Sequence, residues 1–229
     1  MPDSVDPRHL LLVGAGPGLG TAVARRFAGE GYRLTLVARS EPAVAQELRD
    51  TGADVSVLRA DAGDAEGLRA ALAPLFASAG APGVVIYSAA LAAFDDLLTV
   101  SPQQLADAYA VDVIGAVITA QLAVPPMRAA GGGTLLFTGG GFADRLPQEL
   151  ASLSLGKVAL RAAATMLARR VRDDDIHAGS LTILGQIAPG TPFDPDAIAD
   201  VYWTISNEPR DAWREEYRFE GAAEVPAPL

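Results

Sequence analysis

The feature that most constrains the fold is the stretch Leu10–Gly20, in which an apolar run meets closely spaced glycines. It reads Leu-Leu-Leu-Val-Gly-Ala-Gly-Pro-Gly-Leu-Gly, and an amphipathic run from Leu19 to Glu30 follows at once. This pattern predicts a strand, a tight turn and a helix. Glycines allow a sharp turn and a close approach to a ligand, and the helix N-terminus offers free N–H groups to an anion. The stretch indicates a dinucleotide site, although simple turn chemistry remains an alternative.

Further strands and helices alternate along the chain. Compact apolar runs predict strands at residues 33–39, 55–58, 83–88, 134–138 and 181–187, with a weak further candidate at 217–219. Amphipathic or alanine-rich runs predict helices at 41–50, 64–79, 101–124, 150–171 and 196–205, and Pro125-Pro126 is expected to end the third of these. The alternation predicts an α/β fold over residues 1–229: a single-domain, Rossmann-type, doubly wound parallel sheet flanked by helices.

Composition limits the partners. The chain has 229 residues, 50% of them hydrophobic, which suits one domain with a full core. Its net charge is −10 and no Lys/Arg cluster occurs, so we expect no nucleic acid or anionic membrane partner. Cysteine is absent, and two histidines, His9 and His177, are too few for a histidine-built metal site. Because neither a signal region nor a run of about 18 apolar residues is found, we expect no membrane segment and a cytoplasmic location.

The end of the expected second strand indicates which nucleotide would bind. An acidic side chain at this position accepts hydrogen bonds from the 2′-hydroxyl of NAD, whereas a basic one pairs with the 2′-phosphate of NADP. Here Arg39 is followed by Ser40, so NADP(H) is favoured over NAD(H), although Arg39 also suits a solvated surface turn. Asp61, after the third strand, is placed to accept from the adenine amino group or to cap a helix.

In these residues the chain resembles the short-chain dehydrogenase/reductase family, over nearly all its length. Gly14, Gly18 and Gly20 match the family's Gly-x-x-x-Gly-x-Gly turn, and Pro189-Gly190 matches the stretch that flanks the nicotinamide. Asp61 matches its adenine-contacting acid, whereas Tyr87-Ser88-Ala89-Ala90 matches its Asn-Asn-Ala-Gly segment only loosely. The resemblance implies a nicotinamide nucleotide held by Gly14, Gly16, Pro17, Gly18, Leu19, Gly20, Arg39, Ser40, Asp61, Ala62, Ser88, Ala89, Ala90, Thr138, Lys157, Pro189 and Gly190.

The catalytic positions depart from the family's pattern. The resemblance implies that Lys157 holds the nicotinamide ribose, with a surface lysine on a long helix as the alternative. The family's tyrosine acid corresponds to Leu153, its serine to Gly140 and its supporting asparagine to Asp112. We therefore expect catalytic roles for Lys157, Asp112 and Tyr109. An ion pair between Asp112 and Lys157 would replace a water-linked amide.

Three residues are candidates for the missing acid. Tyr109 lies three residues before Asp112 and so on the same helical face, and Tyr87 ends the fourth strand. Asp144 follows the glycine triplet after the fifth strand. Each has a structural alternative, because a buried tyrosine is commonly a core residue and Asp144 suits a turn. His177 is expected to be a surface residue in a loop.

Two functions of different classes are compatible with this pattern. The first is an NADP(H)-dependent oxidoreductase with an altered acid, since hydride transfer to or from a small organic substrate requires cofactor orientation rather than the tyrosine itself. The second is a non-redox protein on the same scaffold, either a cyclase or isomerase or a nucleotide-sensing regulatory protein.

The family resemblance also implies a homodimer or homotetramer, assembled through the long helices at 101–124 and 150–171. Residues 1–8 are expected to form a flexible N-terminus. Residues 190–229 are expected to form a reduced substrate lid and a C-terminal tail, with Trp203 and Trp213 packing this end or a subunit contact.

Overall fold

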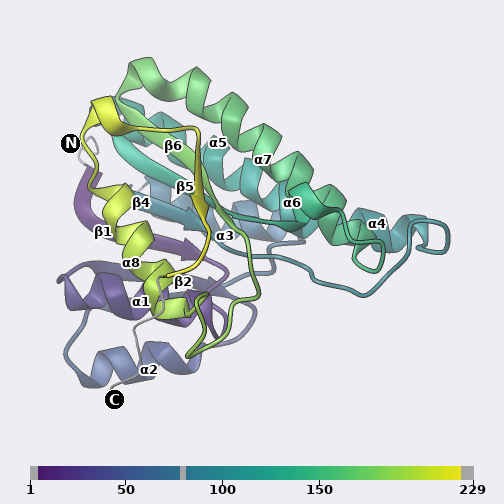
Figure 1. Cartoon of the computed structure of the whole chain (residues 1–229). Coiled ribbons are helices and arrows are strands. Elements are labelled where there is room, and N and C mark those ends of the chain that lie inside the picture. Colours follow the sequence, from purple (N-terminus) through teal and green to yellow (C-terminus); the bar gives the residue numbers. More distant parts are fainter. Residues whose placement is uncertain (1–4, 78–80, 223–229) are drawn as a thin grey trace.

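A seven-stranded parallel sheet lies between two layers of helices (Figure 1). This computed structural model describes residues 5–77 and 81–222, and the proline-rich tail at 225–228 lies outside the described residues. The sheet has the order β3-β2-β1-β4-β5-β6-β7. It is built from β1 (Val5–Val13), β2 (Arg33–Ala38), β3 (Val55–Arg59), β4 (Ala81–Tyr87), β5 (Gly133–Gly140), β6 (Ile176–Ile183) and β7 (Glu216–Phe219). The prediction of one Rossmann-type domain is confirmed.

Two apolar layers join the helices to the sheet, because successive residues of a strand face opposite sides. In β1, Leu10 and Leu12 face one layer, whereas Leu11 and Val13 face the other. The first layer holds α1 (Leu19–Gly29), α2 (Ala43–Asp50) and α8 (Pro195–Ser206). The second holds α3 (Ala65–Ala77), α5 (Gly115–Ala129) and α7 (Ala151–Val171). Strands that are buried on both faces have continuous apolar sequences, and for this reason most of them could be predicted from the sequence.

The strand order reverses between β1 and β4, which brings the loops after these two strands together. The backbone amide of Ser88, just after β4, donates to the carbonyl of Val13 at 2.7 Å. In open α/β sheets, ligands bind in the crevice at such a reversal, outside the carboxyl ends of the strands. The glycine turn that follows β1 therefore lies at the expected ligand edge.

The helix predicted at 101–124 begins as expected but is not uniform. The side chain of Ser101 accepts a hydrogen bond from the backbone amide of Gln104 at 3.2 Å, so α4 (Pro102–Tyr109) starts with the expected cap. The helix then widens into a π-helix, Ala110–Ile114, before α5 begins. In a π-helix each hydrogen bond spans five residues instead of four, so residues three apart no longer share a face.

The predicted stop at Pro125 and Pro126 is wrong, because α5 continues through both prolines to Ala129. A proline has no N–H, so it leaves the carbonyl of the residue four positions earlier without its helical partner. For Pro125 that residue is Gln121, which is exposed, so water can take the place of the missing donor.

One helical stretch also differs from the expectation that no run could span a membrane. By length and composition, Pro102–Ala129 could do so, with a mean hydropathy of 1.5. Half of its most apolar window is buried inside the fold, as in the core helix of a soluble protein. The stretch is therefore weak evidence for a membrane span.

Strand β6 was predicted at 181–187, but it starts at Ile176 and ends at Ile183. The strand contains polar residues, which interrupt the apolar pattern expected of a buried strand. The hydrogen-bond partners of His177 and Thr182 lie far away in the sequence, so the burial of these two residues could not be predicted. Thr182 donates to Glu216 on β7 at 2.7 Å, and Nε2 of His177 lies 3.0 Å from the hydroxyl of Tyr217. His177 is thus only 2% exposed, and its predicted place in a surface loop is wrong.

Both ends of the chain contribute to the fold. β1 begins at Val5, so residues 5–8 belong to the sheet instead of the expected flexible terminus, while residues 1–4 lie outside the described range. After Gly190 the chain soon reaches α8, which packs against α1. Trp203 on α8 packs edge-on against Phe27 with ring centroids 5.4 Å apart, as expected for a residue that packs this end.

Candidate active site

The turn after β1 forms an open cradle. Gly14 has a φ of 94°, and a Cβ atom there would lie 2.4 Å from the backbone nitrogen of Ala89, so only glycine allows this close approach. Gly18 has a φ of 84° and precedes α1 with no side-chain cap. No atom would lie within 4 Å of a Cβ at Gly16 or Gly18. The space and the helix N-terminus that faces it fit a pyrophosphate group, although the amide of Thr21 donates to the carbonyl of Gly16 at 3.1 Å.

Arg39 and Ser40 follow β2 at the same edge of the sheet, and both are exposed. Within residues 5–77 and 81–222, the guanidinium of Arg39 has no ion-pair partner. Arg59, at the end of the neighbouring strand, lies 3.9 Å from Glu41 instead. The charge of Arg39 is therefore available to a ligand phosphate.

Asp61 lies in the loop after β3, next to Ala62. Its Oδ1 accepts a hydrogen bond from the backbone amide of Gly63 at 2.9 Å, so this oxygen stabilises the turn. The residue is exposed, which leaves its second oxygen open to solvent or a ligand. A turn role and a ligand role are thus both compatible with its geometry. Pro189 and Gly190 are likewise exposed, and the amide of Gly190 donates to Asp194 at 2.6 Å.

Lys157 is buried on α7, with 5% of its surface exposed, so the alternative of a surface lysine is wrong. Its Nζ donates to the carbonyl of Thr138, on β5, at 2.9 Å. Burial lowers the pKa of Lys157, and the charge of Asp112 opposes this shift. The hydroxyl of Thr138 shares a hydrogen bond with Tyr202 on α8 at 2.7 Å, so Thr138 offers Lys157 its carbonyl and directs its hydroxyl into the core.

Asp112 is fully buried in the π-helix. Its Oδ1 accepts from the backbone amide of Leu91 at 2.9 Å, whereas its Oδ2 is buried with no hydrogen-bond partner. Burial raises the pKa of Asp112 to about 6, and the charge of Lys157 and the Leu91 amide limit the rise. The predicted ion pair is not formed, because no contact within 4.0 Å joins the charged atoms of Asp112 and Lys157. The two groups interact through their charges only.

Glycine at position 156 leaves the room that Asp112 occupies. A Cβ atom at Gly156 would lie 2.6 Å from Oδ2 of Asp112. The π-helix and α7 therefore meet through the carboxyl group of Asp112 and the backbone of Gly156, directly beside Lys157 in the sequence. A larger residue at 156 would displace the carboxyl group.

Gly140 and Leu153, the positions predicted to correspond to the family's serine and tyrosine, both lie near Lys157. A Cβ atom at Gly140 would lie 3.9 Å from Cγ of Lys157 and 3.3 Å from the ring of Phe142. Leu153 is buried one helical turn before Lys157 on α7. Neither Gly140 nor Leu153 has a side chain that can donate a proton.

Tyr109 is not brought together with Asp112. The π-helix that follows Tyr109 changes the helical repeat, so the predicted common face is wrong. Tyr109 is 44% exposed and lines an apolar groove between α4 and α7, together with Leu155 and Val158.

The other two candidate acids have structural partners. Tyr87 is fully buried, and its hydroxyl donates to the carbonyl of Val111 in the π-helix. Burial raises the pKa of Tyr87, which makes it a weaker acid. Asp144 on α6 (Phe142–Arg145) pairs with Arg161 at 2.5 Å and with Arg218 at 2.6 Å. Hydrogen bonds from these arginines lower the pKa of Asp144, so it remains ionised.

Sequence reasoning missed two partners of the site: the carbonyl of Thr138 and the backbone amide of Leu91. Every residue carries such groups, so no side-chain pattern signals them. Asp95 helps to place the loop that carries Leu91, because its Oδ1 accepts from the amide of Ser152 at the start of α7, at 3.0 Å. Loop aspartates are common, so the sequence contains only a weak indication that Asp95 accepts a hydrogen bond from the start of α7.

Comparison with known proteins identifies the class of protein. The family described as short chain dehydrogenase matches residues 8–189, and the chain belongs to this family of oxidoreductases. A galactitol 2-dehydrogenase (L-tagatose-forming) from Cereibacter sphaeroides is 31% identical over 183 residues, which is 78% of this chain and 69% of that protein. A 3-dehydrosphinganine reductase from Arabidopsis thaliana is 26% identical over 180 residues, 76% of this chain. The match spans only 54% of that reductase.

Solved structures share the fold. L-sorbose reductase from Gluconobacter frateurii, complexed with NADPH and L-sorbose, has a TM-score of 0.86 at 21% identity, with 97% of this chain and 98% of that chain covered. A metagenomic short-chain oxidoreductase in complex with NADP has a TM-score of 0.82 at 21% identity, with 93% and 98% covered. At these identities the likeness concerns the fold and leaves the substrate open.

Proposed function

We propose that this chain is an NADP(H)-binding oxidoreductase with an atypical active site, which transfers a hydride to or from a small organic substrate. The burial of Lys157 at the ligand edge of the sheet is the observation that supports this proposal most strongly. Lys157 is the only lysine among 18 lysines and arginines, and it lies at the position of the family's lysine. Arginine carries positive charge everywhere else in the chain. Lysine has a compact ammonium group, whereas arginine has a planar guanidinium group with a different hydrogen-bonding geometry. The use of lysine at this one position therefore supports a specific role for its ammonium group in the site.

Each part of the site has a separate proposed role. The turn Gly14–Gly20 and the segment Ser88–Ala90 would hold the nucleotide, with Arg39 at its 2′-phosphate. Bound NADP(H) supplies or accepts the hydride. The ammonium of Lys157 would donate hydrogen bonds to the ribose, and the charge of Asp112 would favour the protonated lysine. Leu153 would exclude water from its side of the site.

A second candidate is a non-redox protein on the same scaffold, such as a cyclase, an isomerase or a nucleotide sensor. The absence of a proton donor at Gly140 and at Leu153 favours it. Incubation of the protein and NADPH with a panel of carbonyl compounds and activated alkenes separates the two candidates. Oxidation of NADPH with any member of the panel supports the oxidoreductase, whereas tight NADPH binding without any turnover supports the alternative.

Arg39→Ala is expected to weaken NADPH binding about tenfold and to leave NADH binding unchanged, because only NADPH has the 2′-phosphate. Calorimetry and nicotinamide fluorescence measure both affinities. Arg59→Ala is the matched control, since it removes an exposed arginine from the end of the adjacent strand β3. Equal affinity of the unaltered protein for both nucleotides, or an equal loss in the two variants, would contradict the preference for NADP(H).

We propose that the chain assembles as a homodimer or homotetramer through the groove between α4 and α7. Exposed apolar side chains line it, among them Leu155, which is 47% exposed. Leu155→Glu is expected to yield a monomer, since assembly would bury an unpaired charge. Size exclusion with light scattering measures this, with Gln46→Glu on the exposed side of α2 as the control. A monomer before any substitution would rule out the assembly.

A further inference from the structure

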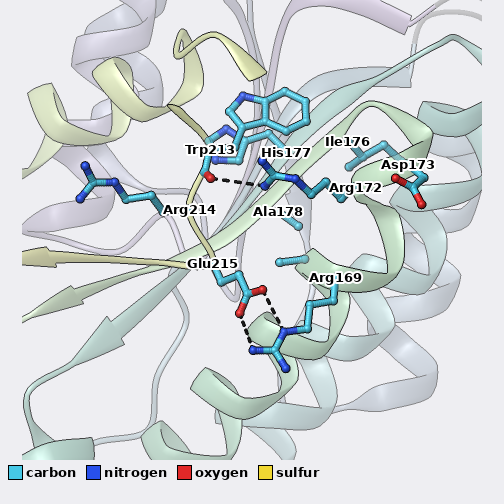
Figure 2. A pocket seen from close by; sticks show the side chains of 10 residues that line it. Arg169, Arg172, Asp173, Ile176, His177, Ala178, Trp213, Arg214 and Glu215 are labelled. Atoms are coloured by element: carbon cyan, nitrogen blue, oxygen red, sulfur yellow. Dashed lines mark hydrogen bonds and ion pairs between the residues drawn. The ribbon is translucent and has the colours of Figure 1, made fainter. Parts of the chain in front are cut away.

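A separate cavity of about 210 Å³ lies where β6 begins (Figure 2). The end of α7, the start of β6 and the segment before β7 surround it. Because all strands of the sheet are parallel and the glycine turn follows the end of β1, this cavity lies at the opposite edge of the sheet from the candidate active site. Along α7, Arg169 is roughly 18 Å from Lys157 at 1.5 Å per residue.

The cavity wall includes Arg172, whose charge also acts on Glu215 in the same wall but which forms no ion pair within 4.0 Å among the described residues. Arg172 donates only to the backbone carbonyls of Trp213 at 3.3 Å and Arg210 at 3.4 Å, and no described carboxylate lies within 4.0 Å of it. The neighbouring Arg169 differs, since it donates twice to Glu215 at 2.9 Å (Figure 2). Arg172 therefore retains charge and donors for an anion.

The wall also contains the charged residues Arg169, Asp173, Arg214 and Glu215, and its remaining side chains are apolar or aromatic. The indole of Trp213 stacks on the ring of His177, with centroids 4.8 Å apart and an angle of 5° between the planes. His177 in turn bonds Tyr217, whose hydroxyl donates to Glu208 at 2.5 Å. Burial and the charge of Arg172 lower the pKa of His177 to about 4, so the ring is neutral at pH 7. Ile176 completes an apolar wall beside these rings.

We propose that this cavity binds a small organic carboxylate with a flat apolar body, its carboxylate paired with Arg172 and its body against Trp213 and Ile176. Guanidinium and carboxylate groups have matching planar geometry and form paired hydrogen bonds. The size is suitable, because an apolar cavity of about 150 Å³ holds benzene. The inference does not depend on the proposed oxidoreductase function.

Fluorescence of Trp213 tests the proposal. The chain has two tryptophans, so Trp203→Phe leaves Trp213 as the single reporter. Benzoate is the probe, and benzamide is its neutral counterpart of similar shape. We expect benzoate to change the fluorescence in a saturable way with a Kd of about 1 mM or lower. Benzamide should bind at least about tenfold more weakly, since it lacks the charge.

Arg172→Gln is expected to raise the Kd of benzoate at least about tenfold. Arg25→Gln, which removes an exposed charge paired with Glu47, should leave it unchanged. NADPH affinity should stay the same in both variants, which separates this site from the proposed cofactor site. The benzamide comparison uses the intact cavity and remains decisive if Arg172→Gln does not fold. Absence of saturable benzoate binding, equal binding of benzamide, or full binding by a folded Arg172→Gln protein would overturn the proposal.

Discussion

Lys157→Met is expected to lower kcat/KM for NADPH-dependent turnover by about 10²–10⁴-fold while the fold is kept. Methionine has a similar length and fills the buried space, but it has no ammonium group. The hydrogen bond to the carbonyl of Thr138, which is 2.9 Å long, is lost, and so are the donors proposed for the ribose. The loss of positive charge also leaves the buried Asp112 without the charge that limits its pKa. Steady-state rates with a substrate found in the panel, together with NADPH titration, measure the effect.

The control is Arg170→Met, which removes an exposed cation from the same helix. This variant should retain its rate and its NADPH affinity. Chemical unfolding of both variants shows whether a lost rate reflects a lost fold. A folded Lys157→Met protein that turns over at the original rate would show that hydride transfer does not depend on this lysine.

Asp112→Asn is expected to raise the free energy of unfolding at neutral pH by about 1–3 kcal/mol. Burial raises the pKa of Asp112 to about 6, whereas its ordinary value is 3.8. Between these two values the folded protein binds more protons than the unfolded chain, so the stability due to this group falls as the pH rises from about 4 to about 6. This difference between the two pKa values corresponds to roughly 3 kcal/mol. Asparagine cannot ionise, and its side-chain oxygen can still accept a hydrogen bond from the Leu91 amide. Its NH₂ group needs a hydrogen-bond partner, which reduces the gain in the free energy of unfolding.

Urea unfolding of the unaltered protein and of Asp112→Asn between about pH 4 and pH 8 measures this difference. The two stability curves should converge at low pH and separate as the pH rises. Asp144→Asn is the control, because hydrogen bonds from Arg161 and Arg218 lower the pKa of Asp144 and its loss should not stabilise the protein at neutral pH. Parallel curves for Asp112→Asn and the unaltered protein would show that Asp112 has no raised pKa.

Sequence alone was sufficient where structure depends on neighbouring residues. The stretch Leu10–Gly20 predicted its strand, turn and helix, because apolar runs, glycines and helix periodicity act over a few positions. Ser101 was recognised as a helix cap for the same reason. Lys157 was found by its spacing within the family's pattern, and its burial agrees with a role at the site.

Sequence alone failed where the outcome depends on segments far apart in the chain. His177 was expected at the surface, but β6 takes it into the interior beside Tyr217. Tyr109 was expected beside Asp112, but the π-helix turns it toward α7. The sequence by itself determined the order of strands and helices, since this follows from local patterns, and the family resemblance pointed to Lys157. Only the tertiary structure decided how Lys157 is held, because packing between β5, the π-helix and α7 gives it a hydrogen bond to the carbonyl of Thr138 and keeps Asp112 near it without an ion pair.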